Sequence, residues 1–152
     1  MKEGICKEDL LEELHQAIRS RISEASRILD EVQESVDSES QSTAGDKHDT
    51  SRELMQQERN KAAQNLQNQM AMDGLFITLK NTSHSKVITF GSLVLTSIGW
   101  IFIGLPLGKL IFNKIDILCI SGNSPMAKAL VNRKVGARIE MNNMSIEIIE
   151  LK

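Results

Sequence analysis

Two long helical patterns, separated by a short polar stretch, constrain this chain more than any other feature. From Glu8 to about Ser38, apolar residues recur every three or four positions, as in a helix that packs against one partner helix. A second, weaker pattern runs from about Asp46 to Leu79. Between them, Asp37 to Gly45 are small and mostly polar residues that compete with a helix for backbone hydrogen bonds. We therefore expect an antiparallel hairpin about 45 Å long.

The hairpin prediction rests on one apolar seam along each helix. The first seam consists of Leu11, Leu14, Ile18, Ile22, Ala25, Leu29, Val32 and Val36. The second consists of Leu54, Met55, Ala62, Leu66, Met70 and Ile77. A parallel dimeric coiled coil is the alternative, which the polar turn disfavours.

The composition changes after a polar linker at residues 81–85, from helix formers to β-branched and apolar residues. Ser124 can cap a short helix that runs to about Val131, with Pro125 at its first position. Strands are predicted at 86–88, 92–96, 100–105, 115–120, 138–141 and 145–151. The fold class is therefore α+β: a coiled-coil hairpin over residues 1–80, with its tip at about 38–50, and an antiparallel sheet domain over 86–152.

One uncharged segment, Val87 to Gly108, is about as long as a bilayer-spanning helix. Its glycines, Pro106, hydroxyl residues and many valines and isoleucines favour short strands joined by turns. A membrane-tethered coiled coil stays open as a minor alternative. The N-terminus lacks the apolar core of a signal peptide, so we expect a cytoplasmic protein without a membrane segment.

Charge and cysteine content exclude several classes of function. Lys and Arg number 18 against 20 Asp and Glu, so the net charge of −2 gives no global attraction to nucleic acid, and any such contact requires a local patch. Cys6 and Cys119 lie far apart without CxxC spacing or histidine companions, which argues against structural zinc. His15 and His84 likewise have no ligand-spaced partners, and His48 is expected to be exposed to solvent.

Two stretches of the C-terminal half match motifs of one known family. Residues 124–136, Ser-Pro-Met-Ala-Lys-Ala-Leu-Val-Asn-Arg-Lys-Val-Gly, with Ser124, Pro125, Ala127, Leu130 and Gly136 in matching places, resemble the Ser-Pro motif of the GreA/GreB transcript cleavage factors. Residues 90–94, Phe-Gly-Ser-Leu-Val, are similar to the family's Phe-Gly-Ser-x-Val strand. The family has an N-terminal coiled-coil hairpin followed by an FKBP-like domain, so the resemblance covers nearly the whole chain.

Two positions in the Ser-Pro stretch depart from the family pattern. Asn132 stands where the family often has glycine, and Ala137 where it usually has aspartate. Asparagine tolerates a left-handed backbone, so Asn132 is expected to turn the chain there.

The hairpin tip also resembles the family. Gly45-Asp46-Lys47-His48-Asp49 is similar to its Gly-Asp-x-x-Glu, although Thr50 to Glu53 replace its Asn-Ala-Glu-Tyr. From the residues alone, Asp46 could cap the second helix, with Asp49 in its first turn. The resemblance implies that Asp46 and Asp49 act at the catalytic centre, where they hold a Mg²⁺ shared with the polymerase.

The resemblance implies an accessory factor, without enzymatic activity alone, that enters the secondary channel of a bacterial RNA polymerase and promotes cleavage of backtracked RNA. A monomer is expected, in contact with polymerase and indirectly with the nascent RNA 3′ end. Arg52, Arg59 and Lys61 could contact that RNA, although a solvated helix face is the commoner explanation of such residues, because Glu53 and Glu58 lie nearby in the sequence. The alternatives are a channel regulator that does not stimulate cleavage and a prolyl isomerase, and the scarcity of aromatic residues argues against the latter.

Overall fold

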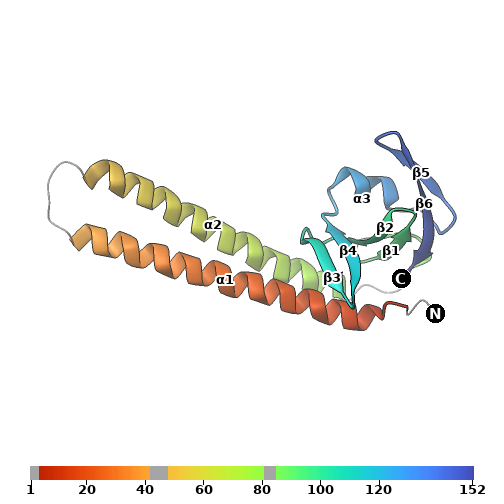
Figure 1. The fold of residues 1–152 in the computed structure, drawn as a ribbon, viewed down its shortest axis with the longest axis horizontal. Coiled ribbons are helices and arrows are strands. Elements are labelled where there is room, and N and C mark those ends of the chain that lie inside the picture. Colours follow the sequence, from red (N-terminus) through yellow and green to blue (C-terminus); the bar gives the residue numbers. More distant parts are fainter. Residues whose placement is uncertain (1–3, 42–47, 81–84) are drawn as a thin grey trace. The chain divides into compact units, whose positions relative to one another are not determined.

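The computed structural model describes residues 4–41, 48–80 and 85–152. The chain divides into two compact units, one formed by His15–Asp73 and the other by Met1–Leu14 together with Gly74–Lys152. We call the first the hairpin unit and the second the sheet unit. Both long helices cross the boundary, so the sheet unit contains the start of one helix and the end of the other (Figure 1).

The hairpin unit is built from helices α1 (Lys7–Gln41) and α2 (His48–Lys80). Their cross-helix contacts run in antiparallel register, since His15 faces Asp73 near one end and Gln33 faces Arg59 nearer the other. The predicted pair of antiparallel helices is therefore confirmed. Helix α1 continues beyond the predicted Ser38 because no glycine or proline interrupts residues 38–41, and residues 42–47 lie outside the described part of the chain.

The seam of α2 differs from the prediction. Leu54, Met70 and Ile77, placed on its apolar side, are each more than half exposed. Among the described α2 residues, the buried apolar ones are Ala62, Met72, Phe76 and Leu79. Apolar residues therefore occur on more than one face of α2, and the weak periodicity could not show which face is buried.

The sheet has six strands in the order β3-β4-β2-β1-β6-β5. Along the chain these strands are β1 (Leu93–Thr96), β2 (Gly99–Ile103), β3 (Gly108–Phe112), β4 (Ile115–Ile120), β5 (Arg138–Met141) and β6 (Met144–Leu151). Helix α3 (Pro125–Leu130) connects β4 to β5. Neighbouring strands are antiparallel except β2 and β4, so the sheet is mixed, whereas an antiparallel sheet was predicted. The parallel pair arises because β4 lies between β2 and β3, its own hairpin partner.

One strand of the sheet was not predicted, and one predicted strand is not formed. Strand β3 was not predicted, because Pro106 and Gly108 read as turn residues and the strand is a short edge strand. The predicted strand at 86–88 is irregular: Ile88 donates its N–H to Arg133 O and accepts from Asn132 N, at 2.9 and 2.8 Å, outside the sheet ladder.

Helix α3 and one face of the sheet enclose a continuous apolar core. Its fully buried members include Ala127 and Leu130 of α3 and Ile101 and Ile103 of β2. The other buried members are Ile88, Val94, Ile139, Ile146 and Ile148. Alternation along each strand places these side chains on the face toward α3.

Within the sheet unit, the end of α2 packs against the connection from β2 to β3. At Gly104, which has φ +125°, an added Cβ would lie 2.7 Å from Leu79 Cδ1. The positive φ favours glycine at this position, and an added Cβ would also displace the end of the Leu79 side chain. The connection from β2 to β3 therefore contacts the last turn of α2 through Gly104 and Leu79.

The uncharged segment Val87–Gly108 contains β1 and β2 and no helix. Within the described ranges, no helix has both the length and the apolar character needed to cross a bilayer.

Candidate functional site

Asp46 and Asp49 are the residues predicted to hold magnesium, and most of the residues around them lie outside the described part of the chain. Asp46 lies in residues 42–47, outside the described residues. Asp49 lies in the first turn of α2, where a carboxylate is favoured by the helix dipole, and its side chain is not among those described. The two acids therefore belong to the connection from α1 to α2 and to the turn that follows it.

The half of α1 that leads to this connection is strongly acidic. From Ile28 to Gln41 the sequence has five acids and no basic residue, and Asp30, Glu34 and Asp37 are exposed. Carboxylates near a helix C-terminus are unfavourable with respect to the helix dipole. The acidity of this half of α1 is therefore not explained by the stability of the helix.

Arg27 marks the start of this acidic half. Its guanidinium donates to Glu24 Oε1 at 2.6 Å and also pairs with Glu31. The hydrogen bond and charge of Arg27 lower the pKa of the Glu24 carboxyl, and both carboxylates raise the pKa of Arg27. These groups are exposed, so the pairs stabilise the helix only slightly.

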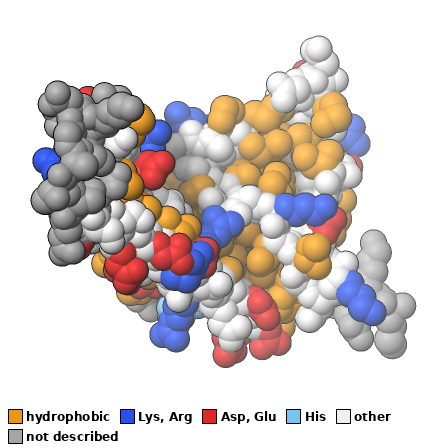
Figure 2. All heavy atoms as spheres, turned by 60° about the vertical axis from the view of Figure 1, so that its left-hand side comes forward, with side chains coloured by type: hydrophobic (Ala, Val, Ile, Leu, Met, Phe, Trp, Pro, Cys, Tyr) orange, Lys and Arg blue, Asp and Glu red, His pale blue; other side chains and the backbone are white. Residues whose placement is uncertain are grey.

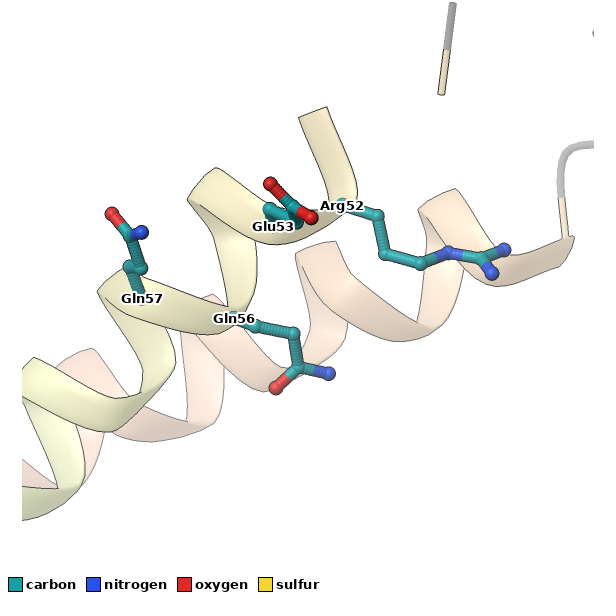
Figure 3. Close-up of a pocket in the computed structure, with 4 residues that line it drawn as sticks. All are labelled: Arg52, Glu53, Gln56 and Gln57. Carbon is teal, nitrogen blue, oxygen red and sulfur yellow. The ribbon is translucent and has the colours of Figure 1, made fainter. Parts of the chain in front are cut away.

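A shallow, open hollow of about 530 Å³ lies beside the first turns of α2, lined by Arg52, Glu53, Gln56 and Gln57 (Figure 3). All four side chains project from α2, and each is exposed. The hollow offers charged and amide groups but no enclosed apolar wall, so it lacks the usual character of a small-molecule site.

The three predicted RNA-contacting cations do not form one group. Arg59 is half-buried, and its Nε donates to Gln33 Oε1 of α1, so it joins the two helices. Arg52 and Lys61 are exposed. Residues seven apart share a helix face, whereas residues two apart do not, so Arg52 lies on the side of Arg59 and Lys61 lies away from it.

His15 and Asp73 form the cross-helix contact at the other end of the hairpin unit. His15 Nε2 lies 3.4 Å from Asp73 Oδ1, and both side chains are about one-third exposed, at 32% and 36%. Among the described residues, no cluster of three or more His, Cys, Asp or Glu side chains is arranged to hold a metal ion. Magnesium binding by Asp46 and Asp49 thus stays a prediction.

The Ser-Pro stretch has the predicted local structure. Ser124 caps α3, with its Oγ accepting from Ala127 N at 3.2 Å and donating to Ser121 O at 2.8 Å. Pro125 follows at the first helical position, and Ala127 and Leu130 are fully buried. These residues shape the fold of α3 and leave Pro125 and Lys128 on the surface.

The chain leaves α3 through two left-handed residues. Asn132 has φ 70°, which confirms that asparagine turns the backbone where the family often has glycine. Gly136 has φ 92°, and its N–H donates to Ile148 O at 2.8 Å. The motif therefore ends in a turn that is hydrogen-bonded to β6.

Exposed apolar side chains on the sheet were not predicted from the sequence. Ile111 of β3 and Leu118 of β4 are 68% and 42% exposed. Phe90 is half exposed and lies against Gly122, where an added Cβ would lie 2.7 Å from its ring. Figure 2 shows hydrophobic side chains gathered on one face of the sheet unit. Alternation in β3 and β4 would have suggested this surface, had β3 been predicted.

Comparison with family models, with curated proteins and with solved structures finds no match for this chain.

Proposed function

We propose that the protein is an accessory factor of bacterial RNA polymerase that inserts its hairpin into the secondary channel and promotes cleavage of backtracked RNA. The observation that carries the proposal is the antiparallel pairing of α1 and α2, whose connecting residues include the Gly45-Asp46-Lys47-His48-Asp49 sequence. Such a hairpin can reach a site that is too narrow for the sheet unit.

The sheet unit would bind the polymerase surface, and its fold would be of the FKBP-like type. The residues that carry the resemblance support this assignment, since Ser124 and Pro125 begin α3 and Asn132 and Gly136 form left-handed turns after it. The exposed Ile111 and Leu118 offer apolar area for a protein contact. The protein would work as a cytoplasmic monomer.

The proposed chemistry uses Asp46 and Asp49 as ligands of a Mg²⁺ ion that the polymerase also holds. Carboxylate oxygens suit this hard cation, which retains several waters. A second magnesium ion stabilises the attacking water and the leaving oxygen in cleavage of a phosphodiester. The factor alone would show no nuclease activity, since two acids do not complete a magnesium site.

The test is cleavage of labelled RNA in stalled, backtracked complexes of the cognate polymerase with magnesium. Asp46→Ala and Asp49→Ala should each reduce cleavage to the intrinsic rate of the polymerase. Glu58→Gln is the matched control, because Glu58 is an exposed α2 carboxylate beyond the first turns, and it should cleave like wild type. Undiminished cleavage by both aspartate variants would contradict the mechanism.

A second candidate is a regulator that occupies the channel without stimulating cleavage. The replacement of the family's Asn-Ala-Glu-Tyr by Thr50 to Glu53, together with the shorter second acid Asp49, favours it. Polymerase binding by the wild type without any cleavage in the same assay would establish this function.

A further inference from the structure

The overall charge conceals opposite charges in the two parts of the chain. Residues 1–80 contain ten basic and sixteen acidic residues, whereas residues 81–152 contain eight basic and four acidic residues. Between Asp116 and Glu140 the sequence has no acid but includes Lys128, Arg133, Lys134 and Arg138. Residues 81–152 therefore carry a net positive charge, whereas residues 1–80 carry a net negative charge.

Three cations of this part meet at one rim of the sheet unit. Ile88 N donates to Arg133 O at 2.9 Å, and Asn132 N donates to Ile88 O at 2.8 Å, so the segment carrying Lys86 lies beside Arg133 and Lys134. All three cationic side chains are exposed. We call Lys86, Arg133 and Lys134 the basic rim.

The backbone under the basic rim is held in place. Arg133 N donates to Leu130 O at 3.0 Å, and Lys134 O accepts from Ala137 N at 3.1 Å. Leu130 and Ile88 are fully buried on either side. Arg133 and Lys134 therefore project from a turn whose backbone is hydrogen-bonded at both ends.

Three other cations of the sheet unit are paired with carboxylates, whereas Lys114 and Lys128, like the rim cations, take part in no salt bridge among the described residues. Lys109 pairs with Asp116 at 3.2 Å, Arg138 with Glu147 at 3.8 Å and Lys152 with Glu150 at 3.7 Å. Within the described ranges, no salt bridge involves Lys86, Arg133 or Lys134. The rim charges are thus not neutralised by the fold.

We propose that the basic rim binds the phosphate backbone of double-stranded DNA. Lysine is depleted in protein–protein interfaces, whereas Lys and Arg supply most contacts to phosphates, so two lysines and one arginine without a carboxylate favour a nucleic acid over an acidic protein. None of the three rim residues is aromatic, and the exposed Phe90 four residues after Lys86 lies against Gly122, so no aromatic platform for an unpaired base is evident and a duplex is favoured over a single strand. This proposal is independent of the polymerase proposal.

The test is the anisotropy of a fluorescent DNA duplex titrated with the full chain at several salt concentrations. Three phosphate contacts predict that the logarithm of the association constant falls with the logarithm of salt concentration with a slope of about −3. The triple variant Lys86→Gln, Arg133→Gln, Lys134→Gln should bind at least about tenfold more weakly at low salt and show a flatter slope.

The matched control is Arg19→Gln, Lys80→Gln, Lys114→Gln, which removes one arginine and two lysines from exposed positions elsewhere and should retain wild-type affinity. Circular dichroism would verify that both variants are folded. Equal binding of an RNA duplex would support the backbone contact. The proposal is overturned by absence of duplex binding, by equal loss in the two triple variants, or by tighter binding of single-stranded DNA or of poly-glutamate.

Discussion

The hairpin unit and the sheet unit are stabilised by different amounts of apolar burial. Among the described residues of His15–Asp73, the buried apolar side chains are Ile18, Ala25, Ala62 and Met72. In the sheet unit, α3 and the strands enclose a continuous core with many fully buried side chains. Local hydrogen bonds and a thin seam support the hairpin unit, whereas long-range packing supports the sheet unit. The same substitution should therefore have different effects in the two units.

The largest difference is expected for leucine to alanine. Leu130→Ala removes a fully buried core side chain and should lower the free energy of unfolding by about 2–5 kcal/mol. Leu54→Ala removes a side chain that is 57% exposed and should change it by less than about 0.5 kcal/mol. Urea unfolding followed by the fluorescence of Trp100, the only tryptophan, reports on β2, and circular dichroism reports mainly on the helices. Equal losses of unfolding free energy in Leu130→Ala and Leu54→Ala would contradict the difference in apolar burial between the two units.

Replacing glycine by alanine should lower the free energy of unfolding at a left-handed turn and raise it inside helix α2. Gly136 has φ 92° with open space around an added Cβ, so Gly136→Ala tests backbone strain alone and should cost about 1–2 kcal/mol. Gly74 lies inside α2, also with open space, and Gly74→Ala should add about 0.5–1 kcal/mol. Thermal unfolding of both variants measures the two changes in stability. Destabilisation by Gly74→Ala would show that Gly74 has a packing role.

Serine to alanine should separate a capping hydroxyl from a helix-surface hydroxyl. Ser124→Ala removes the cap of α3 and should cost about 1 kcal/mol. The hydroxyl of Ser35 donates to Glu31 O at 3.2 Å inside α1, and Ser35→Ala should leave stability unchanged or slightly higher. Urea midpoints at constant slope give both values, and a similar loss in both variants would argue against the capping role.

The smallest effect concerns pH in the hairpin unit. Because Arg27 lowers the folded pKa of Glu24, this pair contributes stability above the unfolded pKa of about 4.3, and the contribution is lost as pH falls through the lower folded value. An NMR titration of the Glu24 carboxyl should show a midpoint below 4.3, the approximate unfolded value. In Arg27→Gln the midpoint should rise, and an unchanged midpoint would mean that the contact does not persist in solution.

Local signals in the sequence predicted much of the fold. Helical periodicity predicted both long helices, and β4 and β5 begin and end at the predicted residues. Ser124 and Pro125 predicted the start of α3, and Asn132 was correctly expected to be left-handed, because capping and left-handed turns depend on a few neighbouring residues.

Features that depend on distant residues could not be predicted from one sequence. The parallel pairing of β2 with β4 and the contact of Arg59 with Gln33 depend on topology and register. The exposure of Leu54 and Met70 depends on which face of α2 the chain covers. For the candidate site, sequence supplied the residues Asp46 and Asp49, and their geometry depends on a segment outside the described residues.

In the proposed function the sheet unit would bind the polymerase, and Asp46 and Asp49 would act at the catalytic centre. The most direct test measures polymerase affinity and RNA cleavage for the double variant Asp46→Asn, Asp49→Asn on the same backtracked complexes. We expect the affinity for the polymerase to be unchanged and RNA cleavage to fall to the rate of the polymerase alone. Affinity that falls in parallel with cleavage, or cleavage that persists at the wild-type rate, would contradict this proposal.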